Sequence, residues 1–266
     1  MRVRLGLISD VHGNRVALEA VVSDGIVNGV DEWWALGDLV AIGPDPVATL
    51  HLLMNLPKVS FVGGNTDRYV VSGDRPAPSA EDVDRDPSLM SLFRAVESSF
   101  AWTRDQLSRD DLAWLAALPT VQRRSFPDGT RLTGVHASLR SDDGTGITPD
   151  LPDDVLEALV AEADADVVCG GHTHQPTDRQ VGRTRAINLG SVSNPITSDL
   201  RAAYVIFEGD RHDHRIAHRR VRYDHDAVLE RIRRSGHPES EYIASFQLGE
   251  QVRYSAHRPG APATSM

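Results

Sequence analysis

The chain has 266 residues with 40% hydrophobic and 25% charged side chains, a composition that suits one large α/β domain or two small ones. Its formal net charge of −10 argues against bulk binding of nucleic acid, because a negative surface repels the phosphate backbone, but a small phosphate ester remains compatible. No apolar stretch approaches the ~20 residues of a membrane helix. The single cysteine, Cys169, lies in an apolar run, which predicts a buried strand residue in a reducing compartment. We therefore expect a cytoplasmic protein that does not bind a membrane.

The first quarter of the chain alternates between predicted strands and helices. Strands are expected at residues 3–9, 32–36 and 59–62, with helices at about 14–28 and 44–55. Asn14 is placed to cap the first helix, and Pro44 and Pro46 suit the first turn of the second. This alternation favours parallel strands in an α/β layer, where ligands bind beyond the strand ends.

Residues 72–87 are rich in Pro and Asp and have little to bury, which predicts a mobile surface loop. Because this segment follows Asn65 closely, it either borders a site at Asn65 or is a solvated insertion without a role. Two helices are expected after it, near residues 88–106 and 109–118.

The second half of the chain is rich in predicted strands. Turn residues at 127–130, 181–184 and 208–211 predict three hairpins, with a helix near 153–163 and a strand at 166–169. We expect this half to be largely antiparallel. The whole pattern predicts an α/β (α+β) fold with two sheets packed face to face and helices on both sides. It also predicts one domain over residues 1–235, followed by a polar tail or arm at 236–266 that is loosely ordered or packs against the domain.

Five short segments contain candidate metal ligands. They are Asp10-Val11-His12, Gly37-Asp38, Gly63-Gly64-Asn65-Thr66-Asp67, Gly134-Val135-His136 and Gly170-Gly171-His172-Thr173-His174. An Asp-x-His or His-x-His segment at a strand end sends alternate side chains to one side, so both can approach one centre. Each segment alone is a weak signal, but the ordered set of five predicts a metal site.

In order and spacing, the five segments resemble the calcineurin-like metallophosphoesterase superfamily, and more narrowly its small bacterial and archaeal single-domain phosphodiesterases. The resemblance extends over about residues 3–207 and implies an αββα sandwich. It implies one metal ion held by Asp10, His12, Asp38 and His174, and a second held by Asp38, Asn65, His136 and His172. Asp38 would bridge the two ions. The segment Asn188-Leu189-Gly190-Ser191-Val192 resembles a loop that follows the last histidine pair in this family, with Leu189 where Pro is usual.

The donor types fit this implied chemistry. Mixed imidazole and carboxylate ligands suit divalent transition metals, with Mn²⁺ favoured and Fe, Zn²⁺, Co²⁺ or Ni²⁺ as alternatives. Two such ions ~3.5–4 Å apart neutralise phosphoryl oxygens and activate water, so we expect a metal-bound water or hydroxide as nucleophile. Asp38, Asn65 and His136 are the predicted catalytic residues.

One position departs from the family pattern. Most members have His after the Asn, where it is held to assist the leaving group as a general acid, and this chain has Thr66. A hydroxyl is far too weak an acid for that role, and Asp67 is normally ionised. We expect Thr66 to cap the following helix and Asp67 to orient a ligand, which leaves the general acid unidentified.

Other histidines and aromatic residues favour structural roles. His212, His214 and His218 are interpreted as an exposed edge-strand face, with a third metal site as the less favoured alternative. Of Trp33 and Trp34, one is expected to face the core and the other an outer layer.

The leading functional hypothesis is hydrolysis of small phosphodiesters. The alternatives are a phosphomonoesterase, a dinucleotide polyphosphate hydrolase, and a non-catalytic scaffold or regulatory module on the same fold. An intact ligand set favours an enzyme over a scaffold.

Overall fold

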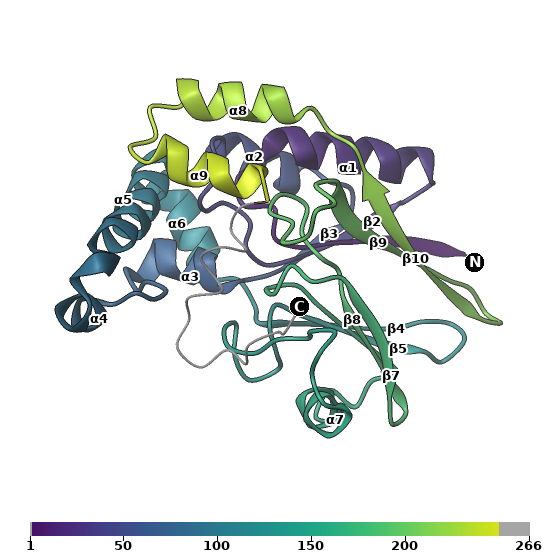
Figure 1. The fold of residues 1–266 in the computed structure, drawn as a ribbon. Helices are drawn as coiled ribbons and strands as arrows, with labels where there is room; N and C mark the ends of the chain where they lie inside the picture. Colours follow the sequence, from purple (N-terminus) through teal and green to yellow (C-terminus); the bar gives the residue numbers. More distant parts are fainter. Residues whose placement is uncertain (1, 250–266) are drawn as a thin grey trace.

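The computed structural model describes residues 2–249 as two five-stranded sheets packed together, with helices outside them (Figure 1). The first sheet has the strand order β10-β9-β1-β2-β3, and the second has the order β4-β5-β6-β8-β7. The strands are β1 (Val3–Ile8), β2 (Glu32–Leu36), β3 (Val59–Val62), β4 (Val121–Ser125), β5 (Arg131–Val135), β6 (Val167–Gly170), β7 (Thr177–Val181), β8 (Thr184–Asn188), β9 (Ala202–Gly209) and β10 (His214–Val221). The helices are α1 (Arg15–Val27), α2 (Pro46–Met54), α3 (Asn65–Ser72), α4 (Ala80–Arg85), the short 3-10 helix η1 (Pro87–Leu89), α5 (Met90–Gln106), α6 (Arg109–Ala116), α7 (Asp153–Ala161), α8 (His225–Arg234) and α9 (Ser240–Gln247).

The predicted two-sheet sandwich is confirmed. The parallel βαβ pattern of the first third is also confirmed, because β1 pairs with β2 and β2 pairs with β3 in parallel register. The Asn14 side chain accepts a hydrogen bond from the Ala17 amide at 3.0 Å, so Asn14 caps α1 as predicted.

The second sheet corrects one expectation. The three hairpins form where they were predicted, but β6 pairs in parallel with both β5 and β8. The reason is that α7 connects β5 to β6, and such a crossover returns the chain in the same direction. The carboxyl ends of β5 and β6 therefore lie at the same edge of this sheet.

The interface between the sheets is apolar. Leu5, Leu7 and Trp34 of the first sheet belong to one buried cluster with Leu132 and Ile187 of the second. Trp33 points the opposite way, into the cluster beneath the outer helices, because successive strand residues alternate between faces. The expected division of the two tryptophans is confirmed.

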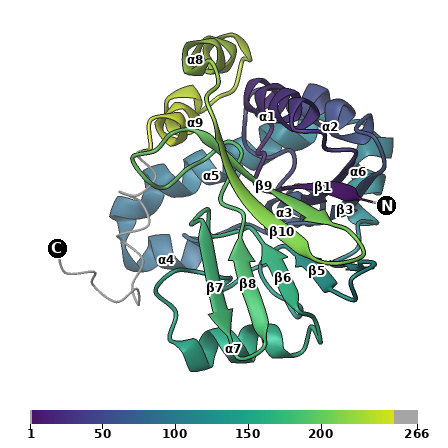
Figure 2. The ribbon, with the colours of Figure 1, turned by 90° about the vertical axis from the view of Figure 1, so that its right-hand side faces the viewer.

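Helices cover the outer faces of both sheets (Figure 2). α1 and α2 lie over the first sheet, while Leu156 and Val160 of α7 pack on Val168 and Ala186 of the second. No helix in residues 2–249 is long and apolar enough to cross a membrane.

The segment 72–87 is more structured than expected. It contains α4, which begins after Ser79, whose hydroxyl accepts a hydrogen bond from the Asp82 amide at 3.2 Å. Val83 is buried, and Arg75 pairs with Glu97 at 3.1 Å. The prediction of a loop was wrong for this short helix, because Ser79 and Asp82 cap its first turn and Val83 gives it an apolar contact.

The region after residue 235 contains α9. Its residues Ile243 and Gln247 are buried, and the helix packs against α8. Residues 250–266 of the predicted tail lie outside the described residues, and a domain limit at residue 235 stays a prediction.

Candidate metal centre

The candidate ligands meet where five strands end. Residues 10 and 12 follow β1, residue 38 follows β2, residue 65 begins the helix after β3, residue 136 follows β5, and residues 172 and 174 follow β6. The structure brings all seven predicted ligand residues together: Asp10, His12, Asp38, Asn65, His136, His172 and His174. This is the edge at which α/β sheets place ligands.

The backbone at the ligand residues is not the extended strand that was predicted to aim alternate side chains to one side. Asp10, His12, Asp38, His172 and His174 all have left-handed backbones, with φ between 48° and 68°. Non-glycine residues occupy this region at a cost of ~1–3 kcal/mol each, and such positions cluster at functional sites. Tight turns beyond the strands, and not the strand pleat, therefore aim these side chains inward.

Two glycines allow the loops to approach closely. A Cβ atom on Gly37, whose φ is +87°, would lie 2.5 Å from Nδ1 of His136. A Cβ atom on Gly171 would lie 1.9 Å from Oγ of Ser9 and 2.2 Å from Oδ2 of Asp10. The glycines that precede the ligands are required by this packing.

The first group of donors surrounds Asp10 and His174. Nε2 of His174 lies 3.0 Å from Oδ1 of Asp10 and 3.1 Å from Nε2 of His12. Nε2 of His12 lies 3.7 Å from Oδ2 of Asp38. The donor atoms of Asp10, His12, Asp38 and His174 all lie within 4.8 Å of one another, a spacing that one metal ion can bridge.

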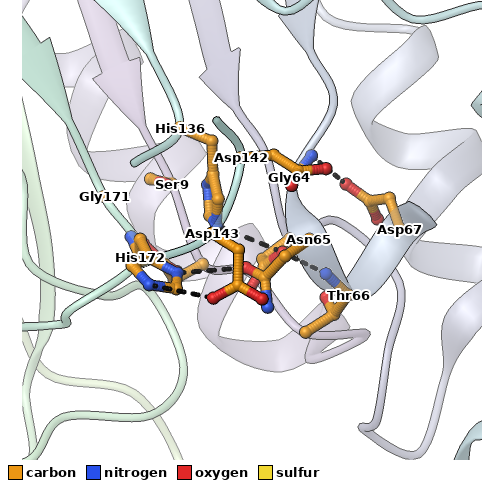
Figure 3. Close-up of polar contacts among 12 residues, drawn as sticks. Ser9, Gly64, Asn65, Thr66, Asp67, His136, Asp142, Asp143, Gly171 and His172 are labelled. Carbon is orange, nitrogen blue, oxygen red and sulfur yellow. Dashed lines mark hydrogen bonds and ion pairs between the residues drawn. The ribbon is translucent and has the colours of Figure 1, made fainter. Parts of the chain in front are cut away.

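The second group surrounds Asn65 (Figure 3). Oδ1 of Asn65 lies 3.0 Å from Nε2 of His136 and 3.0 Å from Nδ1 of His172. Nε2 of His136 lies 3.3 Å from Oδ1 of Asp38. The two carboxylate oxygens of Asp38 therefore face different groups, Oδ2 toward His12 and Oδ1 toward His136.

Each of the four imidazoles is held by a backbone carbonyl. Nδ1 of His136 donates to Leu36 O at 2.8 Å, and Nδ1 of His174 donates to Asn194 O at 2.7 Å. Nδ1 of His12 donates to Ala41 O, and Nε2 of His172 donates to Gly144 O at 2.9 Å. A ring that donates through one nitrogen presents a lone pair on the other when neutral, and metal-ligating histidines are oriented in this way.

The second nitrogens of the four rings therefore converge on carboxylate and amide oxygens, and each offers a lone pair when its ring is neutral. The 3.1 Å approach of His12 Nε2 to His174 Nε2 is repulsive unless positive charge lies between the rings or a proton sits on one of them. The donor set fits divalent transition cations, which prefer such mixed nitrogen and oxygen ligands.

The electrostatics also call for positive charge. Burial would raise the pKa of Asp38, but His136 and His12 hold the pKa well below its usual range. Burial would lower the pKa of His136, but Asp38 beside it raises that pKa to about 10. Two carboxylates, Asp10 and Asp38, are fully buried here, and a buried anion requires a compensating cation.

The prediction that Thr66 caps the following helix is wrong. Asn65 is the first residue of α3, so Thr66 already lies inside the first turn, and its amide donates to Oδ1 of Asp38 at 2.9 Å. Within residues 2–249, the buried Thr66 hydroxyl has no hydrogen-bond partner. The helix start is stabilised by Asp67, whose carboxylate accepts from the Gly64 amide at 3.0 Å and the Leu39 amide at 2.9 Å. Burial and the charge of Asp38 raise the pKa of Asp67 to about 7.

The loop after β8 supports the histidine pair. The Asn188 amide group donates to Gly171 O at 2.6 Å, Thr173 Oγ1 at 2.9 Å and Ile147 O at 3.0 Å. Ser191 Oγ donates to Asp10 O at 2.8 Å. The sequence singled out this loop by resemblance, but it gave no role to Asn188 or Ser191.

A second supporting loop, residues 138–148, was missed. Its Asp143 carboxylate lies 3.7 Å from Nε2 of His172 (Figure 3), and its Asp142 pairs with Arg68 at 2.8 and 3.0 Å. The sequence signal for this loop is the Asp142-Asp143-Gly144 turn. A single sequence does not distinguish it from an ordinary surface turn.

The histidines near β10 do not form a cluster among the described residues. His214 Nδ1 lies 3.2 Å from the Asp128 carboxylate, and His218 Nε2 lies 2.6 Å from the Asp178 carboxylate. β10 is an edge strand, as predicted, and His218 is exposed, but the His214 ring stacks on Phe207 and is only partly exposed, and His212 precedes the strand.

Comparison with known proteins identifies the family. Residues 3–212 match the calcineurin-like phosphoesterase superfamily domain. A metallophosphoesterase from Sphaerobacter thermophilus is 29% identical, with a TM-score of 0.71 over 93% of this chain and 99% of that one. A hypothetical protein from Pyrococcus horikoshii OT3 shares the fold at 20% identity, with a TM-score of 0.74 over 91% of this chain and 97% of that one.

Two curated relatives add to this. An uncharacterized protein of Methanocaldococcus jannaschii is 28% identical over 88% of this chain and 94% of its own length. A symmetrical bis(5'-nucleosyl)-tetraphosphatase of Pectobacterium carotovorum is 31% identical over 59% of this chain, and the match spans about half (49%) of that enzyme. The chain belongs to the calcineurin-like phosphoesterase superfamily and is a hydrolase of phosphate esters.

Proposed function

We propose that the chain is a dinuclear metal-dependent phosphoesterase that hydrolyses small phosphodiesters. The observation that carries the proposal is the orientation of the four histidines. Each ring is fixed by a backbone carbonyl. Its other nitrogen faces either an oxygen of Asp38 or another ligand residue beside Asp38. A carboxylate with its two oxygens facing two donor groups is suited to bridge two cations.

The two donor groups define the two proposed sites. Asp10, His12, Asp38 and His174 would hold one ion, and Asp38, Asn65, His136 and His172 would hold the other. We favour Mn²⁺, with Fe, Zn²⁺, Co²⁺ or Ni²⁺ as alternatives. When bound, two such ions neutralise the phosphoryl oxygens and lower the pKa of water to near neutral.

We propose that the protein supplies orientation and that no side chain is a covalent nucleophile. The hydroxyls of Ser9 and Ser191, beside Asp10, donate to Leu36 O and Asp10 O and so are committed to the backbone. Burial raises the pKa of the Cys169 thiol and keeps it inert. Water is therefore the proposed nucleophile, with Asp38, Asn65 and His136 holding the catalytic centre. The single buried cysteine supports a cytoplasmic location as part of this proposal.

A second candidate is hydrolysis of dinucleoside polyphosphates. It is favoured by the similarity to symmetrical tetraphosphatases, although each match covers only part of those enzymes. No particular feature favours a phosphomonoesterase. A non-catalytic scaffold is disfavoured because all seven ligand residues are present and oriented.

A substrate panel tests the proposal. Purified protein supplied with Mn²⁺ should hydrolyse bis(4-nitrophenyl) phosphate, and Asp38→Asn should lose this activity while keeping the fold. In ¹⁸O-labelled water, the phosphate product should carry the label in a single turnover. No hydrolysis of any monoester, diester or polyphosphate by the metal-loaded protein would refute the proposal, and a covalent phospho-enzyme trapped during turnover would refute water as the nucleophile.

A further inference from the structure

The C-terminal helix α9 ends against the loop that holds His174. This helix lies outside residues 3–212, the part of the chain that matches the family domain, and its last residue, Gln247, is buried. Nε2 of Gln247 donates to Oδ1 of Asn194 and to Oγ of Ser193, each at 3.2 Å. The backbone carbonyl of Asn194 accepts from Nδ1 of His174 at 2.7 Å. The amide of Gln247 therefore fixes the loop that orients this imidazole.

The oxygen of the same amide faces the turn that carries His12. Oε1 of Gln247 accepts from Nδ2 of Asn14 at 3.3 Å. Asn14 is completely buried, and its backbone amide closes the turn by donating to Val11 O at 3.0 Å. One side chain thus joins the turn that carries His12 to the loop that holds the ring of His174.

A primary amide is the side chain that this position requires. An amide has two hydrogens to donate and an oxygen with two lone pairs. Gln247 directs the hydrogens to Ser193 and Asn194, and its oxygen faces Asn14 and, at 3.1 Å, the hydroxyl of Tyr223. A methionine has a similar length, but it has no hydrogen to donate and its sulfur is only a weak acceptor. It would leave the loop and the turn without this link.

The imidazoles of the other donor group are held elsewhere. Nδ1 of His136 donates to Leu36 O at the end of β2, and Nε2 of His172 donates to Gly144 O in the loop 138–148. Within residues 2–249, the side chain of Gln247 makes no hydrogen bond to either of these segments. Loss of its amide should therefore affect the two donor groups unequally.

We propose that Gln247 is a positioning residue for one of the two metal sites, and that α9 is therefore part of the metal centre. The site concerned is the one formed by Asp10, His12, Asp38 and His174. The inference rests on the proposed function, because it concerns the affinity of one ion of the dinuclear centre. Contacts that orient ligating histidines typically change metal affinity by ~10- to 100-fold when they are lost.

The test is a titration with Mn²⁺ of protein freed of metal by a chelator. Gln247→Met should weaken one of the two sites by ~10- to 100-fold and leave the other unchanged. Gln247→Glu, which keeps the length but cannot donate when ionised, should weaken the same site. The matched control is Ile243→Ala, one turn earlier on α9, because Ile243 is buried and its side chain contributes packing but no hydrogen bond. This control should leave both affinities unchanged, and thermal unfolding checks that each variant folds.

Two outcomes of the titration would overturn the inference. One is an affinity of both sites in Gln247→Met equal to that of the wild type. The other is the same loss in Gln247→Met and Ile243→Ala, because the docking of the helix, and not the amide of Gln247, would then determine the affinity.

A measurement without metal separates this inference from the proposed function. In chelator, the ¹⁵N NMR signals of the imidazoles report on the hydrogen bonds of each ring. Gln247→Met should shift the signals of His12 and His174 and leave those of His136 and His172 in place; unchanged signals of the first two would overturn the inference. A wild type that binds fewer than two ions would contradict the proposed function, and the NMR result alone would then decide whether Gln247 orients the two rings.

Discussion

Removing the Asn188 side chain should both destabilise the fold and weaken metal binding. Asn188 is completely buried, and its amide group holds Gly171 O, Thr173 Oγ1 and Ile147 O, while its oxygen accepts from the Gly190 amide at 2.8 Å. An amide has two hydrogens, so at most two of its three donor contacts are fully formed at once. With the accepted bond, Asn188 contributes the equivalent of three hydrogen bonds.

A net value of ~1 kcal/mol for each bond gives a loss of about 3 kcal/mol in the free energy of unfolding for Asn188→Ala. The same change releases the turn that carries His172 and His174, and the loss of such a supporting contact typically weakens metal affinity ~10- to 100-fold. Asn188→Asp keeps the shape but loses both donor hydrogens, so it should be at least as destabilising as Asn188→Ala.

Urea unfolding in chelator measures the stability, and titration of the chelated protein with Mn²⁺ measures the affinity. The matched control is Asn55→Ala, which removes an exposed amide that donates to His51 O at 2.7 Å and should change the stability by less than ~0.5 kcal/mol. If Asn188→Ala unfolded like the Asn55 control and bound Mn²⁺ normally, the assigned support of the histidine turn would be refuted.

Three further changes test other parts of the molecule. Wild-type protein should show a steep dependence of rate on leaving-group pKa across a series of phosphodiesters, because Thr66 cannot donate a proton to the leaving group. Thr66→His should flatten this dependence if the imidazole reaches the leaving group. A flat dependence in the wild type would contradict the prediction. Gln247→Leu should lower the free energy of unfolding by ~2–4 kcal/mol. The reason is that the side-chain amide of Gln247 is hydrogen-bonded in a buried network with Ser193, Asn194, Asn14 and Tyr223. Unchanged urea unfolding would show that this network does not stabilise the fold. Cys169 should resist a thiol reagent at pH 8 until urea is added, since burial raises its pKa; rapid labelling of folded protein would show that the strand opens.

The sequence predicted those features that leave a local pattern. The ligands lie in five short segments that follow strand ends, and the resemblance of this ordered set to a known family grouped all seven. The βαβ alternation and the three hairpin turns were visible because each is set by neighbouring residues.

Features that depend on distant residues could not be predicted. Arg220 and Arg201 meet beside His174 only because β9 and β10 pair with each other and with β1. Gln247 reaches Asn194, which holds His174, from a region of polar sequence with no marked periodicity. The parallel pairing of β6 was missed because hairpin signals on both sides of it suggested an antiparallel half.

The metal content of the purified protein tests the central claim most directly. Elemental analysis of wild type, His12→Ala and Asp38→Asn should give about two transition-metal ions per chain in wild type. His12→Ala should lose mainly one ion, since His12 belongs to one donor group, whereas Asp38→Asn should lose both, since each oxygen of Asp38 faces a different group. Full occupancy in folded Asp38→Asn, or no more than one ion in fully loaded wild type, would contradict a dinuclear centre bridged by Asp38.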